Sequence, residues 1–204
     1  MLVIGIDEVG RGALAGPVVV AVAASVCSPR ELRGLKDSKK LSARQREAWY
    51  ANFVKNPKIA FAVARVYPRQ IEKRNISAAA NLAARRAFAR LEKKTGRRAA
   101  GDRRPVRVFL DGGLYLGDKV WQAANVPTAK TMPKADEKIA AVSIASIIAK
   151  VTRDRFMRRL AKKYPAYGFD VHKGYGTAVH LAALAANGPC DVHRLTFLRK
   201  STTM

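Results

Sequence analysis

The sequence is poor in the residues that build thiol-based or secreted scaffolds. Its 204 residues include only two cysteines, Cys27 and Cys190, which lie far apart and form no CxxC pair. This argues against a disulfide framework and a thiolate zinc site, and it favours a cytoplasmic protein. The first ten residues have no basic region before their short apolar run, so we do not expect a signal peptide. The most apolar later stretch, residues 139–149, is shorter than the roughly 20 residues that cross a bilayer.

Acidic residues are also scarce. The chain has 15 Asp and Glu against 39 Lys and Arg, which gives a formal net charge of +24. Such a surplus favours a polyanionic partner, with nucleic acid first and an acidic membrane surface second. Hydrophobic residues make up 49% of the chain, enough for a buried core, so wholesale disorder is excluded. At this length we expect a single domain over residues 1–204.

The hydrophobic pattern predicts an α/β fold. Two apolar strands, at 2–7 and 17–26, are joined by a short glycine-containing loop, which suggests a hairpin. Hairpin strands followed by strands that alternate with helices favour a mixed sheet flanked by helices. The further strands are expected at 58–67, 106–110 and 128–132, and the helices at 42–55, 77–94, 136–163 and 177–186, with Ser42 as an N-cap.

Four of the scarce acids fall where a strand ends or a helix begins. Asp7 and Glu8 follow the first apolar strand, Asp111 ends another strand, and Asp136 begins the long helix. Strand ends and a helix N-terminus can converge on one cleft of an α/β sheet. Clustered carboxylates repel one another and usually hold divalent cations, and oxygen ligands favour Mg²⁺ or Mn²⁺ over zinc. With the basic surplus, this set suggests two-metal phosphodiester hydrolysis. Each acid alone would more often be a cap, a turn residue or an ion-pair partner.

Asp154 is a weaker candidate because of its distance along the long helix. It lies 18 residues after Asp136, and a continuous helix would separate the two by about 27 Å. Unless that helix breaks, we expect Asp154 to form a structural ion pair with Arg153 or Arg155.

Two glycine-containing loops are candidates for contact with nucleic acid. Residues 10–16 suggest a dinucleotide-binding fingerprint, but the last spacing is one residue too long and a β-branched run follows where a helix is required. We interpret this segment as a loop whose backbone N–H groups approach a phosphate or sugar, with Arg11 adding charge. In residues 172–177, Tyr175 lies between two glycines, where it can stack on a sugar or base and hydrogen-bond a 2′-hydroxyl. Packing of Tyr175 on the next helix is the alternative.

The three histidines raise the possibility of a metal-free two-histidine mechanism, as in some ribonucleases. We disfavour it because His180 lies inside an apolar helix. His193, beside Arg194 in a basic segment, fits a phosphate contact or a hydrogen bond in the core. The basic surplus is spread widely, and we expect only a subset of it to line the path of a duplex.

Taken together, the motifs closely resemble ribonuclease HII, in order and over nearly the whole chain, from Ile4 to about Phe197. The matching segments are 5–12, 14–19, 37–42, 111–112, 134–136, 145–154, 172–177, 188–189 and 193–194. Val9 and Ala13 vary within the first motif, and the stretch 113–118 departs from the expected forms. The Arg-rich loop 95–104 also departs from the family pattern and looks like a feature added locally to this sequence.

This resemblance implies a ribonuclease H-like fold with a C-terminal helical, substrate-binding portion at about 165–204. It implies cleavage of RNA in RNA–DNA hybrids and incision 5′ to single ribonucleotides in duplex DNA, leaving 3′-hydroxyl and 5′-phosphate ends. Mapped by motif, the catalytic and metal-binding residues are Asp7, Glu8, Asp111 and Asp136, with Mg²⁺ or Mn²⁺ as cofactor. Gly10, Arg11 and Gly12 would contact the ribonucleotide and its phosphate, Tyr175 would read the junction with deoxyribonucleotide, and Lys39 and Arg194 are further candidate contacts.

The expected partners are RNA–DNA hybrid and ribonucleotide-containing duplex DNA, and we expect a monomer. The absence of an N-terminal extension argues against the related type III enzyme, and residues 201–204 show no apolar clamp-binding peptide. Two alternatives stay open. A non-catalytic nucleic-acid-binding protein explains the charge but not the four acids, and a ribonuclease HI would be confined to long hybrids.

Overall fold

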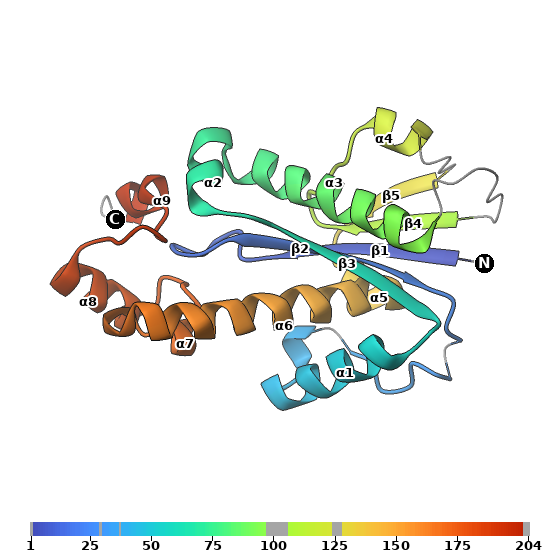
Figure 1. The fold of residues 1–204 in the computed structure, drawn as a ribbon, viewed down its shortest axis with the longest axis horizontal. Helices are drawn as coiled ribbons and strands as arrows, with labels where there is room; N and C mark the ends of the chain where they lie inside the picture. The colour runs from blue at the N-terminus through green and yellow to red at the C-terminus, as the bar shows by residue number, and fades with distance from the viewer. Residues whose placement is uncertain (1, 29, 37, 97–105, 124–127, 202–204) are drawn as a thin grey trace.

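The computed structural model describes residues 2–28, 30–36, 38–96, 106–123 and 128–201. At its centre is a five-stranded mixed sheet of order β3-β2-β1-β4-β5 (Figure 1). β1, β2 and β3 pair antiparallel, whereas β4 and β5 run parallel to β1. This α/β architecture is the predicted one, including the hairpin of the first two strands. The strands are β1 (Leu2–Val9), β2 (Val18–Ser25), β3 (Ile59–Val66), β4 (Val106–Asp111) and β5 (Thr128–Met132).

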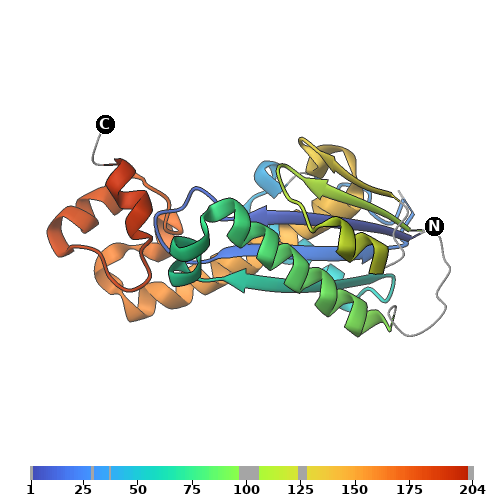
Figure 2. The ribbon, with the colours of Figure 1, turned by 90° about the horizontal axis from the view of Figure 1, so that it is seen from above.

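Helices cover both faces of the sheet. α3 (Ile76–Thr95) packs on one face, and α6 (Ala140–Lys163) with α1 (Ala43–Lys55) packs on the other (Figures 1 and 2). β2 is buried on both faces, and its successive side chains alternate between the two cores. Val18, Val20 and Val22 face α3, while Ala21 and Ala23 face α6 and α1. Small residues on the second face let the long helix lie close to the sheet.

The N-cap predicted at Ser42 is confirmed. The Ser42 hydroxyl accepts a hydrogen bond from the backbone N–H of Gln45, whose side chain accepts one from the backbone N–H of Ser42, so a capping box begins α1. Thr177 likewise caps α8 (Ala178–Asn187) through the N–H of His180.

The expected long helix at 136–163 is wrong in one respect, because it breaks at Ile139. A four-residue helix, α5 (Ala135–Lys138), comes first, and Ile139 is extended at φ −120° and ψ 109° before α6 begins. The start of α5 is fixed by a long-range contact, since the Asp111 carboxylate accepts a hydrogen bond from the backbone N–H of Ala135 at 2.7 Å. This bond holds the start of α5 against the end of β4.

Short helices were missed by the sequence pattern. α2 (Pro68–Arg74) begins with a proline at its first turn, a signal that was available, and α7 (Phe169–His172) lies in the segment expected to be a loop. The other short elements are η1 (Ser38–Lys40), α4 (Asp118–Ala123) and η2 (Pro165–Tyr167). α9 (Leu195–Ser201) completes the C-terminal helical region, which lies beyond the end of β1 (Figure 2).

Some sequence predictions fall on residues that the structure does not describe. They concern Asp37, residues 97–104 of the Arg-rich loop and residues 202–204. Within the described ranges, no helix combines the length and hydrophobicity needed to cross a membrane.

Candidate active site

Asp7, Asp111 and Asp136 converge at the carboxyl ends of β1 and β4. One carboxylate oxygen from each lies within 4.8 Å of the other two. The parallel pairing of β1 with β4, with Ile6 beside Leu110, brings the first two acids to the same edge of the sheet. Asp111 then holds the first turn of α5 through Ala135, which places Asp136 beside them. The convergence expected from the sequence is therefore present for three of the four acids.

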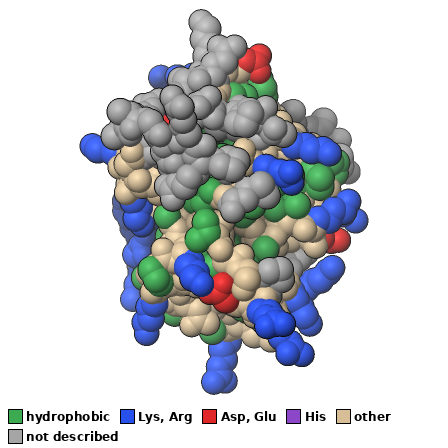
Figure 3. Space-filling view, turned by 90° about the vertical axis from the view of Figure 1, so that its right-hand side faces the viewer, with side chains coloured by type: hydrophobic (Ala, Val, Ile, Leu, Met, Phe, Trp, Pro, Cys, Tyr) green, Lys and Arg blue, Asp and Glu red, His purple; other side chains and the backbone are tan. Residues whose placement is uncertain are grey.

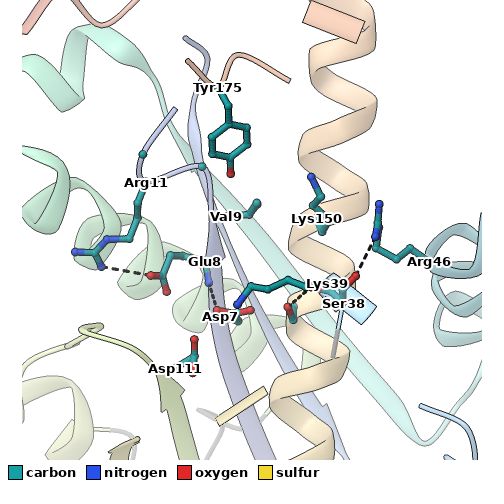
Figure 4. Close-up of a pocket in the computed structure, with 13 residues that line it drawn as sticks. Asp7, Glu8, Val9, Arg11, Ser38, Lys39, Arg46, Asp111, Lys150 and Tyr175 are labelled. Carbon is teal, nitrogen blue, oxygen red and sulfur yellow. Dashed lines mark hydrogen bonds and ion pairs between the residues drawn. The ribbon is translucent and has the colours of Figure 1, made fainter. Parts of the chain in front are cut away.

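Glu8 projects to the opposite face of β1 from Asp7, because side chains alternate along a strand. Its Oε1 lies 3.4 Å from Nη1 of Arg11. The dashed line between Glu8 and Arg11 in Figure 4 marks this ion pair. Its Oε2 is buried and has no hydrogen-bond partner among the described residues. A buried carboxylate oxygen without a partner is costly. A cation beside it would remove that cost, so this acid set fits a divalent metal ion.

The pKa values of the clustered carboxyl groups also favour a bound divalent cation. Burial raises the pKa of Asp7 well above its ordinary value, and the negative charges of Glu8 and Asp111 raise it further. Burial also raises the pKa of Glu8, with Arg11 acting in the opposite direction. The protein thus holds carboxylates where their charges repel, and a bound divalent cation would relieve that repulsion.

These acids open into a cavity of about 430 Å³. Besides Asp7, Glu8 and Asp111, its walls include five of the six residues predicted to contact substrate. Tyr175 enters from the far side, with its hydroxyl directed toward the carboxylates (Figure 4). The five are Gly10, Arg11, Gly12, Lys39 and Tyr175.

The two loops predicted to read nucleic acid touch each other. The backbone N–H groups of Leu14 and Ala15 both donate to the carbonyl of Gly174, at 2.8 and 3.2 Å. A Cβ at Gly174 would lie 2.7 Å from the Ala15 carbonyl oxygen, so only glycine permits this approach. Arg11 also reaches α3, where its Nη2 donates to Ser77 Oγ at 3.1 Å.

Arg194 does not line the cavity. Its side chain is fully buried, and its guanidinium donates to the carbonyls of Gly10, Arg11 and Gly16 at 2.7–3.0 Å. The prediction that Arg194 contacts nucleic acid is wrong, because its donors are turned inward. Arg194 instead fixes the backbone of the glycine-containing loop from inside the protein.

The ion pairs expected for Asp154 are also wrong. Asp154 pairs with Lys150 at 2.9 Å, one turn earlier on α6, and Arg155 pairs with Glu47 of α1. Arg153 donates to backbone carbonyls instead. Although the long helix does break, α6 is continuous from Ala140, and Asp154 is not part of the acid cluster.

The sequence interpretation missed two serines at the site. Ser146 of α6 hydrogen-bonds the Asp7 side chain, and its hydroxyl lies 2.8 Å from that of Ser38. Ser143, one turn earlier, donates to the Asp136 carbonyl at 2.5 Å. Hydroxyls inside the most apolar run of the chain were the available signal, because a buried polar group needs a partner.

No histidine lines the described part of this cavity. His180 and His193 are buried with their Nε2 atoms 3.1 Å apart, and the ring of His172 stacks on His180 at 4.2 Å. This cluster packs against Phe169 in the C-terminal region. Its position agrees with a structural role and does not favour the two-histidine mechanism.

The basic surplus is visible on one end of the molecule (Figure 3). Figure 3, which faces the end of the molecule that carries the N-terminus, shows Lys and Arg side chains around much of the outline and few acidic ones.

The Ribonuclease HII family model matches residues 4–200 of this chain. The chain belongs to the ribonuclease HII family. It is 44% identical to a ribonuclease HII of Delftia acidovorans, over 96% of this chain and 75% of that protein. It is also 44% identical to one of Nitratidesulfovibrio vulgaris, over 95% and 84%. As a member of the ribonuclease HII family, the chain is a ribonuclease H, a hydrolase that acts on RNA–DNA hybrids.

Solved structures of ribonuclease HII proteins share this fold. The enzyme in a PCNA:RNase HII complex from Archaeoglobus fulgidus superposes with a TM-score of 0.73 at 28% identity, covering 96% of this chain and 94% of that one. Ribonuclease H2 of Pyrococcus horikoshii gives a TM-score of 0.70 at 29% identity, covering 98% and 96%. The ribonuclease H-like mixed sheet flanked by helices is thus established.

Proposed function

We propose that this protein is a metal-dependent endoribonuclease. It cleaves the RNA strand of RNA–DNA hybrids and incises 5′ to single ribonucleotides in duplex DNA, leaving 3′-hydroxyl and 5′-phosphate ends. The observation that carries this proposal is the shared cavity. Its carboxylates and its two candidate reading loops face the same space.

The residues that would hold Mg²⁺ or Mn²⁺ are Asp7, Glu8, Asp111 and Asp136. The unpartnered Oε2 of Glu8 supports this role, as does the pKa of Asp7, which burial and then the repulsion of neighbouring carboxylates raise. When bound, two such ions activate a water molecule and stabilise the leaving oxygen of a phosphodiester. The carboxylates need no proton of their own for this, since their work is to supply charge at fixed positions.

The remaining lining residues orient the substrate. The backbone of Gly10 and Gly12 can lie close to a sugar or phosphate because neither carries a side chain, and Arg11 adds a cation beside Glu8. Tyr175 would stack on the sugar or base at the ribonucleotide–deoxyribonucleotide junction, with its hydroxyl near the 2′-hydroxyl. In this arrangement the 2′-hydroxyl is a recognition group and not the nucleophile.

Lys39 is a further candidate contact for a phosphate. Its side chain is 81% exposed at the rim of the cavity, where it can follow a nucleic-acid backbone. We also propose that the C-terminal portion at about 165–204 binds substrate, because it carries the Tyr175 loop. The working unit in this proposal is a monomer with one catalytic domain.

The deciding experiment uses a DNA duplex with one embedded ribonucleotide, incubated with the protein and Mg²⁺ or Mn²⁺. We expect incision 5′ to the ribonucleotide, with 3′-hydroxyl and 5′-phosphate products. Products that end in a 2′,3′-cyclic phosphate would overturn the two-metal account, because they require attack by the 2′-hydroxyl. Cleavage of long hybrids alone would indicate ribonuclease HI-like specificity, and binding without cleavage would indicate a non-catalytic protein.

A further inference from the structure

Arg153 of α6 hydrogen-bonds both loops that are predicted to contact nucleic acid, the one at residues 10–17 and the one at residues 172–177. We call these two segments the reading loops. Its side chain is fully buried, and no carboxylate of the described residues forms an ion pair with it. Its Nε donates to the Pro17 carbonyl and its Nη2 to the Ala15 carbonyl, both at 3.0 Å. Its Nη1 donates to the Lys173 carbonyl at 2.8 Å. One planar group thus holds both the segment after Gly10 and the segment before Tyr175.

The same guanidinium also lies against the Tyr175 ring. Its Cζ is 5.3 Å from the ring centroid, within the range of a cation–π contact. Arg194 offers a comparison, because it is equally buried but holds only the carbonyls of Gly10, Arg11 and Gly16. Of these two arginines, only Arg153 donates a hydrogen bond to the tyrosine loop.

Lysine cannot reproduce this arrangement. A guanidinium presents its donors in a rigid planar fork, whereas an ammonium is a single charged point on a flexible chain. Burial of a charge without a counter-charge is expensive, and an apolar side chain would avoid the cost. The geometry of the carbonyls is therefore the reason for an arginine at this position. Glycine at position 10 follows from it, since a Cβ there would overlap the Arg153 side chain.

We propose that Arg153 is a positioning residue that fixes Tyr175 relative to the loop of residues 10–17, and that this fixed relation sets the preference for a ribonucleotide over a deoxyribonucleotide. The inference rests on the proposed function, because it assigns the reading of the ribonucleotide to these two loops. Arg153 acts through Tyr175 and the loop backbone, without touching the substrate.

The test compares duplexes that differ by one 2′-hydroxyl. Binding is measured in the Asp136→Asn background with Mg²⁺, for a duplex with a single ribonucleotide and for the all-DNA duplex. We expect Arg153→Lys to reduce the ratio of the two affinities by about tenfold, as expected when charged hydrogen bonds at a reading loop are lost. Cleavage with wild-type carboxylates should show the same loss as a higher KM for the single-ribonucleotide duplex.

A double-mutant cycle with Tyr175→Ala separates positioning from general structural damage. If Arg153 acts through the tyrosine, Arg153→Lys should change the affinity ratio little once the ring is gone. Arg155→Lys is the matched control, because it makes the same exchange on the same helix at an ion pair with Glu47, and it should leave the ratio unchanged. Arg153→Gln, which keeps a planar donor without charge, replaces Arg153→Lys if that variant does not fold.

An equal loss of affinity for both duplexes in the Arg153→Lys variant would overturn the proposal. Additive effects of Arg153→Lys and Tyr175→Ala on the affinity ratio would overturn it too. An unmodified protein that binds both duplexes equally would overturn it as well. If the protein prefers the ribonucleotide duplex but does not incise it, the proposed function fails while the positioning role stands.

Discussion

The ammonium group of Lys39 lies 3.7 Å from Oδ2 of Asp136. The lysine side chain is 81% exposed and the aspartate side chain only 3%, so a cation at the rim covers a buried acid of the cluster. A metal ion bound by Asp136 would compete with this ion pair. Lys39 would then be released toward a phosphate of the substrate.

Lys39→Ala should therefore raise the affinity for Mn²⁺ and lower the affinity for duplex. Mn²⁺ affinity without nucleic acid should rise by up to about fivefold, because an ion pair with an exposed partner such as Lys39 contributes at most about 1 kcal/mol. Duplex affinity should fall, and the slope of log K against log salt should decrease by about 0.9, the value for one phosphate contact. Calorimetric metal titration and duplex binding at several salt concentrations measure these effects.

Lys40→Ala is the control for that experiment. Lys40 pairs with Glu137 at 3.7 Å, one residue outside the cluster, and its removal should leave Mn²⁺ affinity unchanged. The interpretation fails if both variants change metal affinity alike, or if Lys39→Ala weakens it.

Asp136→Asn and Asp154→Asn should differ sharply. The first removes a negative charge from the acid cluster, and we expect kcat to fall by more than about 100-fold while duplex binding persists. The second weakens the interactions of a buried carboxylate, chiefly its pair with Lys150, which should cost about 1–3 kcal/mol of stability and leave kcat close to that of the unmodified protein. Single-turnover cleavage and urea unfolding provide both readouts. An inactive Asp154→Asn protein with an intact fold would refute this assignment.

Gly5→Ala should destabilise the fold without touching the cavity. A Cβ at Gly5 would overlap the backbone of Ala141 at the start of α6, and a backbone cannot move aside as a flexible side chain can. We expect the free energy of unfolding to fall by about 1–3 kcal/mol or more. At Gly12 nothing lies within 4 Å of an added Cβ, so Gly12→Ala should change stability by less than about 1 kcal/mol. Its effect should be on KM, since Gly12 lines the cavity. Similar stability losses in both variants would contradict this account.

The histidine cluster should make the protein sensitive to mild acid. Burial, together with the neighbouring His180, lowers the pKa of His193 from 6.5 to about 4. Between these values the unfolded chain binds a proton that the folded chain does not. The free energy of unfolding should therefore be constant above about pH 6.5 and decrease as pH falls toward 4.

Urea unfolding between pH 7.5 and 4.5 measures this dependence. The raised pKa of Asp7 acts in the opposite direction, because protonation of a buried and repelled carboxylate favours the folded state. His193→Gln corrects for this effect, since the carboxylates are common to both proteins. The stability difference between the unmodified and variant proteins should shrink as pH falls, and a difference independent of pH would contradict the assignment.

The sequence was sufficient to predict the features that depend on local patterns. The strands follow from apolar runs, and the convergence of Asp7 with Asp111 follows from acids at strand ends on one edge of a sheet. The inward orientation of Arg194 was not predictable, because it depends on carbonyls contributed by a loop that begins at Gly10. The break at Ile139 was also missed, because the local sequence favours helix across it.

The parallel pairing of β1 with β4 also determines when the carboxylates come to repel one another. Ile6 meets Leu110 only after about one hundred residues of intervening chain have closed into a loop, a slow and entropically costly step. Until that loop closes, Asp7 and Asp111 are not held together, so their repulsion belongs to the folded sheet. If these carboxylates hold divalent cations, as proposed, the cations would bind the folded chain in preference to the unfolded one, and the melting temperature would rise with the free cation concentration. An unfolded chain, whose acids lie apart, would then hold no cation and cut no RNA.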